Sequence, residues 1–517
     1  MQYNATRQFF LNMRHLLRSF RESMVRHGRP TSDRARTQTV VQNFFLHIHS
    51  ARVHEHSLKW STTMGLGIMT TVLFLILVVT GILLMFYYKP SVTSAYNSIK
   101  DIQYVVPTGR LIRNIHRWSA HGMVALVILH MARAFYTAAY KKPREFNWVL
   151  GMALLVITLA LSFTGYLLPW DQLAFWAVTI GSSIAGSPRD LTEALGITQY
   201  FDPGGLIREV LLGAHFVGEE ALIRFFTLHV MVLPIALVTV LGVHLWRIRK
   251  DGGLAHPASA YPDVPPEGAG PEEAPTKSYG LMAVVRELTP ATDREAENLV
   301  PSWPRVFRLE AILTMLVLLA IVGLSLSLDA PLSEQANPAI PENPAKAPWY
   351  FLALQELVSY SAFGGGIVIP GVIMVGLLLI PYLEREDEDV GIWFSGPRGR
   401  RIAAVSAAYA AIVCLAVLAF TVKYGWLRDW LPELTQKYAR TAQIVIMLFN
   451  PGMMFVAACA IWSVGLLRRT NSTRMAAIGL FTCSLVLFTM LTYFATVHRG
   501  PNWGFYWSQA DWPVIEH

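Results

Sequence analysis

Two pairs of histidines lie within apolar stretches of this sequence at nearly equal spacing. His116 and His130 stand at positions i and i+14, and His229 and His244 at i and i+15. At about 3.6 residues per helical turn, each separation is close to four turns, or about 21 to 22 Å along the axis, so both members of a pair face roughly one way. Two such helices side by side would bring His116 opposite His229 and, further along, a second couple together. Each opposed couple could supply two imidazoles to one iron, as in a low-spin haem.

The same four histidines have a plainer interpretation, in which each is hydrogen-bonded inside a helix bundle and binds nothing. Ionisable side chains within membrane spans are costly and are functional candidates by default. Four of them with matched spacing on two segments favour iron ligation over four separate structural roles. His121, His215 and His498 have no spaced partner, and we interpret them as structural or interfacial.

Glycines in the neighbouring apolar segments could accommodate a flat porphyrin. Gly67 and Gly81 share the i, i+14 spacing of the first histidine pair, and Gly122 and Gly151 lie in or beside the next segments. A porphyrin between helices needs positions without side chains where it approaches the backbone. Glycines also serve close helix packing in membranes, so this pattern supports the haem hypothesis without carrying it.

Arginines near the ends of the histidine segments could bind the carboxylates of a haem. Guanidinium groups hold propionates through charge-assisted hydrogen bonds. The candidates are Arg113, Arg117, Arg133, Arg144 and Arg249. Some of them could instead be ordinary anchors at the membrane boundary.

The composition places these segments in a membrane protein. Of the 517 residues, 53% are hydrophobic and only 15% are charged, unlike an ordinary soluble domain. The net charge of +8 could suggest nucleic acid, but in a membrane protein a basic excess more often reflects cytoplasmic loops. Cys414, Cys459 and Cys483 lie in apolar runs without CxxCH spacing. We therefore interpret them as small core residues and expect no covalent haem.

Apolar windows long enough to cross a membrane recur along the chain. A span needs about 20 mostly apolar residues. The sequence therefore predicts an all-α, polytopic membrane fold of about nine transmembrane helices, with an N-terminal four-helix dihaem bundle followed by C-terminal helices. The windows are Thr62–Tyr87, Gly122–Ala139, Trp148–Leu168, Phe225–Trp246, Leu309–Leu328, Ile367–Tyr382, Ile402–Thr421, Thr441–Leu467 and Met475–Val497.

The distribution of basic residues predicts the orientation. Nine spans place the two termini on opposite sides, and the connections on the N-terminal side carry 28 Lys and Arg against 14 on the other side. Because positive residues favour the cytoplasmic side, we expect a cytoplasmic N-terminus in a cell inner membrane or an equivalent energy-transducing membrane. Residues 1–59 lack the apolar core of a signal peptide and are expected to remain as a basic extension.

The connections divide the chain into parts. Two long outer connections, Pro169–Arg224 and Asp329–Gly366, are too long for simple turns, and long ordered loops usually carry function. The segment Ala255–Pro275 is rich in Pro, Gly, Ala and Glu and indicates a flexible linker. The expected parts are a cytoplasmic extension (1–59), a dihaem four-helix domain (60–250), a cytoplasmic linker (251–300), a second helical domain with a long outer loop (301–422), and two additional spans with an outer tail (423–517).

Several motifs together resemble the cytochrome b family of quinol:cytochrome c oxidoreductases. They are Arg113-Asn-Ile-His116-Arg-Trp-Ser-Ala, His130, Lys141-Lys-Pro-Arg-Glu145, Gly165-Tyr-Leu-Leu-Pro-Trp-Asp-Gln172, His229 and His244. The i, i+15 spacing of the second histidine pair is similar to the chloroplast-type branch. The resemblance is dense over about residues 58 to 250 and looser over about 301 to 422, which resembles a C-terminal half that is a separate subunit in chloroplast-type complexes.

This resemblance implies a function. It implies two non-covalent b-type haems, quinol oxidation in an outer pocket beside the His116/His229 haem, and quinone reduction in an inner pocket beside the His130/His244 haem. One electron would go to a Rieske iron–sulfur protein and the other would cross the membrane, coupled to proton translocation. It also implies a c-type cytochrome subunit and a homodimeric complex.

Two departures from the family pattern affect the expected chemistry. The family's outer pocket carries Pro-Glu-Trp-Tyr, whose Glu accepts a quinol proton, but here the tetrad is Ala347-Pro-Trp-Tyr350. Beside Trp349 and Tyr350, we expect Glu356 to replace this acceptor, because proton transfer needs a titratable group within reach of the quinol. Glu356 could instead face solvent or cap a helix. Gly65 stands where the chloroplast-type chain has a cysteine carrying an extra haem, so two haems are expected.

Other interpretations remain open at this point. A dihaem b-type membrane anchor of another quinone-linked oxidoreductase would not need the long outer loops. A transporter could use paired histidines to relay protons. The sequence leaves the quinol open, although loss of the usual Glu could suit menaquinol. The aromatic stretch Arg499–Trp507 could form a membrane-interface belt or a docking surface for a c-type cytochrome.

Overall fold

The computed structural model is almost entirely helical, which confirms the predicted fold class. It describes residues 15, 30–43, 46–251, 253–257, 299–384, 386, 390–431 and 439–513. The sheet in this part of the chain has two strands, with β1 (Arg52–His54) antiparallel to β2 (Leu299–Pro301). Most of the predicted linker, including the stretch from residue 258 to Pro275, lies outside the described residues, as does most of the basic extension.

Eight helical stretches in the described residues are long and apolar enough to cross a membrane. They are α5 (Leu66–Met85), α8 (Glu145–Leu167), α12 to α13 (Glu219–Lys250), α14 (Ser302–Ser327), η6 with α16 (Gly364–Leu383), α17 to α18 (Pro397–Trp430), α21 (Pro451–Thr470) and α22 (Thr473–Val497). The one predicted window that is not among these eight stretches, Gly122–Ala139, overlaps α7 (Gly109–Tyr136). This helix has 28 residues but is less apolar, because it carries histidines and arginines.

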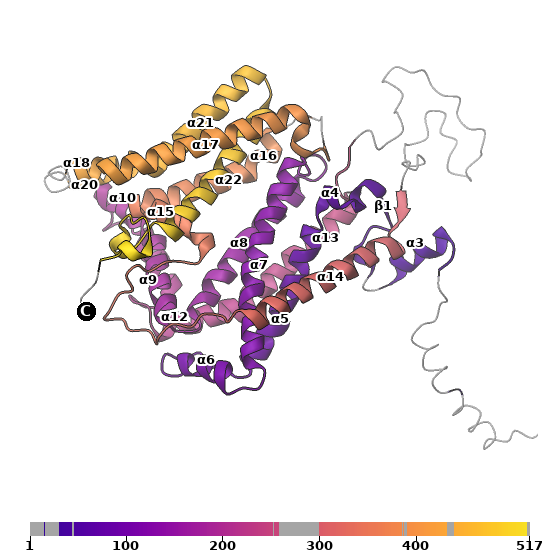
Figure 1. Ribbon diagram of the computed structural model, residues 1–517, viewed down its shortest axis with the longest axis horizontal. Helices are drawn as coiled ribbons and strands as arrows, with labels where there is room; N and C mark the ends of the chain where they lie inside the picture. Colours follow the sequence, from indigo (N-terminus) through magenta and orange to yellow (C-terminus); the bar gives the residue numbers. More distant parts are fainter. Residues whose placement is uncertain are drawn as a thin grey trace, which may run out of the picture.

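The N-terminal helices pair closely side by side. Helix α5 packs along α7, and α8 packs along α13 (Leu233–Lys250). Helix α14 covers the first pair, where Val317 and Ile321 join a buried cluster with Leu73 and Met123. Figure 1 shows α7 and α8 side by side near the centre of the molecule. We call the two ends of this bundle the His116 end and the His130 end, after the histidines of α7 that lie nearer to each.

Two of the spanning stretches contain a π-helical turn. One turn, Leu228–Val232, joins α12 (Glu219–Thr227) to α13, and the other, Gly364–Val368, precedes α16 (Ile369–Leu383). Each turn stands just before a proline, Pro234 or Pro370. Proline has no backbone N–H to donate, so the preceding turn widens to find other donors. The first of these turns contains His229.

The two long connections predicted from the sequence are ordered and meet at the His116 end. The first contains α9 (Gln172–Gly186), α10 (Pro188–Leu195) and α11 (Pro203–Leu212), and the second ends in α15 (Trp349–Tyr360). The Asp171 carboxylate caps α9 by accepting from Ala174 N at 2.9 Å, and it also accepts from Ser333 N at 3.1 Å. One buried side chain therefore ties the two connections together.

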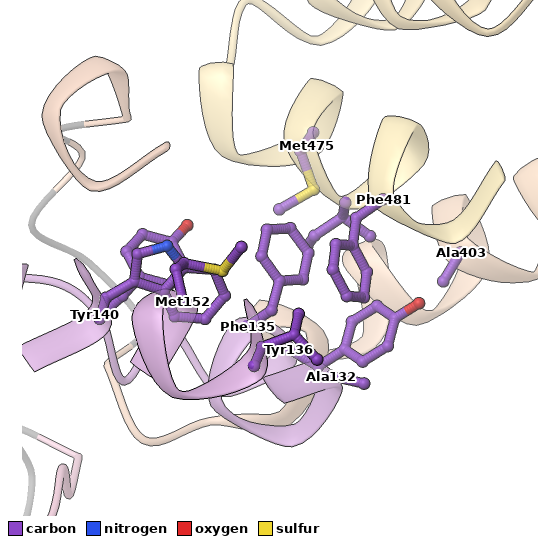
Figure 2. Packing of buried hydrophobic residues seen from close by; sticks show 11 residues of the cluster. Ala132, Phe135, Tyr136, Tyr140, Met152, Ala403, Met475 and Phe481 are labelled. Carbon is purple, nitrogen blue, oxygen red and sulfur yellow. The ribbon is translucent and has the colours of Figure 1, made fainter. Parts of the chain in front are cut away.

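Helix α22 packs against both halves of the chain. It contacts α17, α21 and α15, and its first turns meet the end of α7. Figure 2 shows Phe481 and Met475 of α22 against Phe135, Tyr136 and Tyr140. The rings of Phe135 and Phe481 stack with their centroids 4.0 Å apart. This aromatic packing joins the last helix to the N-terminal bundle at its His130 end.

A buried arginine fixes the same contact. Arg474 is 1% exposed, and its guanidinium donates to the Tyr140 hydroxyl at 2.8 Å and to the carbonyls of Phe135 and Tyr136 at 3.0 and 3.1 Å. Its Nε donates to Ser395 Oγ at 3.0 Å. The guanidinium thus closes the C-terminal end of α7, whose last carbonyls have no partner within the helix.

The three cysteines lie where the sequence predicted. Cys414, Cys459 and Cys483 are buried and unpaired with one another in disulfides, in an apolar cluster that joins α17, α21 and α22. They pack among leucines and aromatic rings, as small core residues do.

Replacement of Arg474 by glutamine tests the anchoring of α22. We expect the free energy of unfolding to fall by about 3 kcal/mol, because several buried hydrogen bonds to a charged donor are lost at once. Thermal unfolding in detergent measures this loss. Arg469→Gln is the matched control, because Arg469 is exposed on α21 near the same end, and equal stability of the two variants would contradict the assignment.

Candidate functional site

Two of the four histidines, His116 and His130, lie on α7, and the other two lie on the π-helical turn before α13 and on α13 itself. His116 of α7 and His229 of the π-helical turn oppose each other, with ring centroids 6.2 Å apart and ring planes at 71°. A metal-bound imidazole nitrogen lies about 2 Å from the metal and about 1 Å from its own ring centre, so two axial ligands have centroids about 6 Å apart. The spacing of this pair therefore fits one iron. His130 and His244 lie within electrostatic range of each other toward the opposite end.

Hydrogen bonds fix the orientation of the two rings at the His116 end. The Nδ1 of His229 lies 3.0 Å from the carbonyl oxygen of Leu161, which can only accept, so Nδ1 carries the proton. The Nδ1 of His116 lies 2.9 Å from Thr80 Oγ1, and that hydroxyl donates to Ile76 O at 2.7 Å. His116 must then donate as well. Both rings therefore keep the Nε2 lone pair for a metal, the usual arrangement around ligating histidines.

Two glycines of α5 lie against the histidines of α7. A Cβ at Gly81 would lie 3.3 Å from Cε1 of His116, and a Cβ at Gly67 would lie 3.2 Å from Cε1 of His130. Gly122, which was also expected at the site, instead lies against Leu73, 3.3 Å from its would-be Cβ. Gly122 therefore serves the packing of α5 on α7.

Two glycines of α8 lie against the other pair of histidines. A Cβ at Gly165 would lie 2.4 Å from Cε1 of His229, and a Cβ at Gly151 would lie 3.9 Å from Cε1 of His244. Sequence reasoning used Gly165 only as part of a motif and missed this role. The available signal was its i, i+14 relation to Gly151, which is the spacing of the two glycines of α5.

A cavity of about 330 Å³ surrounds the His116 pair. Its walls contain both histidines, Gly81 and Gly165, and two of the predicted arginines, Arg113 and Arg117. Its mostly apolar wall, with two arginines in it, suits a ligand that is mostly apolar with an anionic edge.

The two arginines of this cavity differ in how they are bound. Arg113 donates to Gln103 Oε1 at 2.9 Å and to the carbonyls of Ala330 and Pro331 at 2.8 and 2.6 Å. Arg117 lies over the Tyr166 ring, with Cζ 5.1 Å from its centroid. Its buried Nε has no hydrogen-bond partner among the described residues, which leaves a donor for an anionic ligand.

The other three predicted arginines lie toward the His130 end and contact backbone. Arg133 Nε donates to Thr62 O at 2.9 Å, and Arg144 Nε donates to Gly253 O at 3.2 Å. Arg249 donates to the carbonyl of His47. The structure thus separates the five arginines into two groups at opposite ends.

A second cavity, of about 340 Å³, lies next to the first and is almost wholly apolar. Tyr166 lines both cavities. The walls come from α8, α9 and the segment 345–355, and they include Val156, Leu159, Phe163, Ile180, Ile184, Ala345, Ala347, Pro348, Phe351 and Gln355. Of the tetrad that the sequence singled out, Ala347 and Pro348 line this cavity.

The two aromatic residues of the tetrad lie beside the first cavity. The indole Nε1 of Trp349 donates to Nδ1 of His121 at 3.1 Å. Tyr350 lines the first cavity, and its ring lies 5.9 Å from that of His121. Burial raises the pKa of the Tyr350 phenol, so the group stays protonated and can donate a hydrogen bond.

Glu356 lies elsewhere. It is fully buried and lines neither cavity. Arg499 binds its carboxylate through two hydrogen bonds of 2.9 and 2.6 Å. Trp503 Nε1 donates to it at 2.9 Å and the Tyr360 hydroxyl at 2.8 Å. The structure therefore does not bring Glu356 to the pocket, and the alternative that it faces solvent or caps a helix is also wrong.

Comparisons with known proteins concern the region that contains the four histidines. The family described as Cytochrome b/b6/petB matches residues 53–252. Cytochrome b6 of Prochlorococcus marinus strain MIT 9515 is 45% identical over 187 residues, which are 36% of this chain and 80% of that protein. Cytochrome b6 of Euglena gracilis is 44% identical over 187 residues, 36% of this chain and 81% of its own.

A solved structure extends the similarity beyond the matched region. The chain described as "Hyperthermophilic respiratory Complex III" is similar with a TM-score of 0.53 and 22% identity, over 94% of this chain and 98% of that chain. The likeness concerns the fold, and it includes helices that follow the b6-like region.

Replacement of Gly165 by alanine tests the close approach to His229. We expect the ring to be displaced and the content of b-type haem to fall from two toward one per chain, because a Cβ has no room at 2.4 Å. Haem extraction and the reduced-minus-oxidised spectrum measure the content. Gly242→Ala is the control, since a Cβ there meets nothing within 4 Å, and full haem content in both variants would contradict the expectation.

Proposed function

Because this chain belongs to the cytochrome b/b6 family, we propose that it is the cytochrome b subunit of a Rieske/cytochrome b complex that oxidises membrane quinol. The family binds b-type haems. The observation that carries the proposal is the His116/His229 couple, with ring centroids 6.2 Å apart and both Nδ1 atoms held by hydrogen bonds.

The histidines and arginines have distinct roles in this proposal. His116 with His229 holds one haem, and His130 with His244 holds the other. Arg117, whose Nε has no partner among the described residues, and Arg113 line the cavity of the first and would bind its carboxylates. When bound, the two haems supply one-electron transfer across the membrane between an outer quinol site and an inner quinone site. Gly67, Gly81, Gly151 and Gly165 keep the rings close to the helix backbones.

The apolar second cavity is the proposed quinol-oxidation pocket. Its walls are almost wholly apolar, and Tyr166 joins it to the cavity of the His116 pair. Pro348 lines it but cannot accept a proton. Glu356 is already bound to Arg499, Tyr350 lines the neighbouring first cavity, and Trp349 lines neither cavity. Tyr166 lines both cavities, so its hydroxyl is the group that can meet the quinol in place of a carboxylate. This arrangement differs from the family pattern in the group that meets the quinol.

The membrane setting and partners follow from the same proposal. The His116 end is the outer side, and the His130 end, with its basic connections, is the cytoplasmic side of an inner or equivalent energy-transducing membrane. A Rieske iron–sulfur protein and a c-type cytochrome accept electrons on the outer side, in a homodimeric complex that translocates protons. The complex III-like fold over nearly the whole chain supports this assembly.

Purification of the intact complex tests the function. We expect two b haems per chain, a co-purified Rieske protein, and quinol oxidation that outer-pocket inhibitors block. A complex without haem would support a transporter. A dihaem complex that contains no Rieske protein and oxidises no quinol would support a simple membrane anchor.

Replacement of His130 by leucine tests the assignment of separate haems. We expect loss of the haem at the His130 end alone, because the other couple is about four turns away on the same helix, and we expect quinol to reduce the remaining haem. Difference spectra and haem content measure this. His215→Leu is the control, since His215 is exposed on a loop. Retention of both haems in His130→Leu would refute the ligand role.

A further inference from the structure

We propose that residues 496–503, the last two residues of α22 and the tail that follows it, form a positioning element for the quinol-oxidation pocket, with Arg499 as its central residue. We call this segment the tail brace. The inference rests on the proposed function, because it assigns the second cavity to the quinol. None of residues 496–503 lines either cavity, so the segment acts through the residues that do.

The first contact holds helix α15. Arg499 and Glu356 form a buried ion pair, with their side chains 10% and 0% exposed. Arg499 also donates to Trp503 O at 2.8 Å, which folds the tail back on itself so that the Trp503 indole reaches the same carboxylate. The Tyr360 hydroxyl supplies a further donor. A carboxylate with four hydrogen bonds in a buried site has one position, so the middle of α15 is fixed by the tail brace.

The second contact holds the segment before α15. The side-chain amide of Asn343 donates to Asn502 Oδ1 at 2.9 Å, and Asn502 N donates back to Asn343 Oδ1 at 2.6 Å. Lys346 Nζ donates to Thr496 O at 2.7 Å. Ala345, which lies between these two anchors, is part of the cavity wall. The tail brace therefore supports the pocket on the side of the loop as well.

Gln355 connects the two contacts. It is the neighbour of Glu356 on α15, and its side-chain amide forms hydrogen bonds with two residues of the segment before this helix. Its Nε2 donates to Ala345 O at 2.6 Å, and its Oε1 accepts from Ala347 N at 2.9 Å. A shift of Glu356 would move Gln355 with it, and the cavity wall at Ala345 and Ala347 would follow.

Helix α22 holds the tail brace in place. Arg474 lies in the first turn of α22 and Arg499 just beyond its last turn. The whole helix has 25 residues and a length of about 37 Å. Each arginine is buried in hydrogen bonds to another part of the chain. At its first residue, α15 is held to α7 by the hydrogen bond from Trp349 to His121. Hydrogen bonds therefore hold helix α15 both to α7 and to the tail brace.

Arg499→Gln tests the proposal in the purified complex. The substrate is decylubiquinol or menadiol, whichever the parental complex oxidises. We expect kcat/KM to fall about tenfold to hundredfold with a raised KM, because a small misplacement of pocket walls is costly, while both b haems remain bound. Arg499→Lys keeps the charge and should recover part of the loss. A purely structural role would lower haem content and yield together and leave KM unchanged.

Asn343→Ala is a second test that does not disturb a buried charge. Asn343 is exposed, so the variant should fold, and losing its two bonds to Asn502 should raise KM to a smaller extent than Arg499→Gln. Asn337→Ala is the matched control, because Asn337 is exposed in the same loop. We expect Asn337→Ala to keep the parental kcat and KM.

The outcomes separate the two proposals. A parental complex that oxidises quinol, together with Arg499→Gln and Asn343→Ala at parental kcat and KM, would overturn the tail brace alone. A parental complex that binds two haems and oxidises neither quinol would contradict the proposed function, and the inference with it. If Arg499→Gln does not assemble, Asn343→Ala decides.

Discussion

The rest of this structure depends on one constraint, which is that imidazole rings from different helices must face each other across the bundle. Two rings can meet with their Nε2 atoms free only if each Nδ1 is held by its surroundings. Here Thr80 and the carbonyl of Leu161 do this at the His116 end. The neighbouring helices must also come close without side chains, and the glycines of α5 and α8 meet this need.

A second constraint concerns the pocket beside these rings. Its walls are built from segments distant in the chain, namely α8, α9 and the stretch before and along α15. Apolar contact alone would leave such a wall free to slide, whereas directional hydrogen bonds select one arrangement. The Glu356–Arg499 pair supplies that selection from outside the cavity, in a chain whose tetrad carries Pro348 in place of a carboxylate.

Much of the fold followed from local patterns. Apolar windows of roughly the length of a membrane span predicted the helical membrane fold, and each of the nine windows overlaps a helix of the structure. The i, i+14 and i, i+15 spacings placed the histidines on common faces, because helical periodicity is a property of the backbone. For the same reason Gly67 and Gly81 could be assigned to the neighbourhood of the histidines, whereas Gly122 turned out to face Leu73.

The sequence by itself determined what repeats along one helix: the spans, the paired histidines and the glycines with matching spacing. Only the tertiary structure decided which side chains meet across long separations. Glu356 and Arg499 are 143 residues apart, and no periodicity relates them, so a carboxylate that looked available for a quinol proton is in fact bound by an arginine. The physical reason is that a buried charge needs a partner, and the fold alone selects which one it finds.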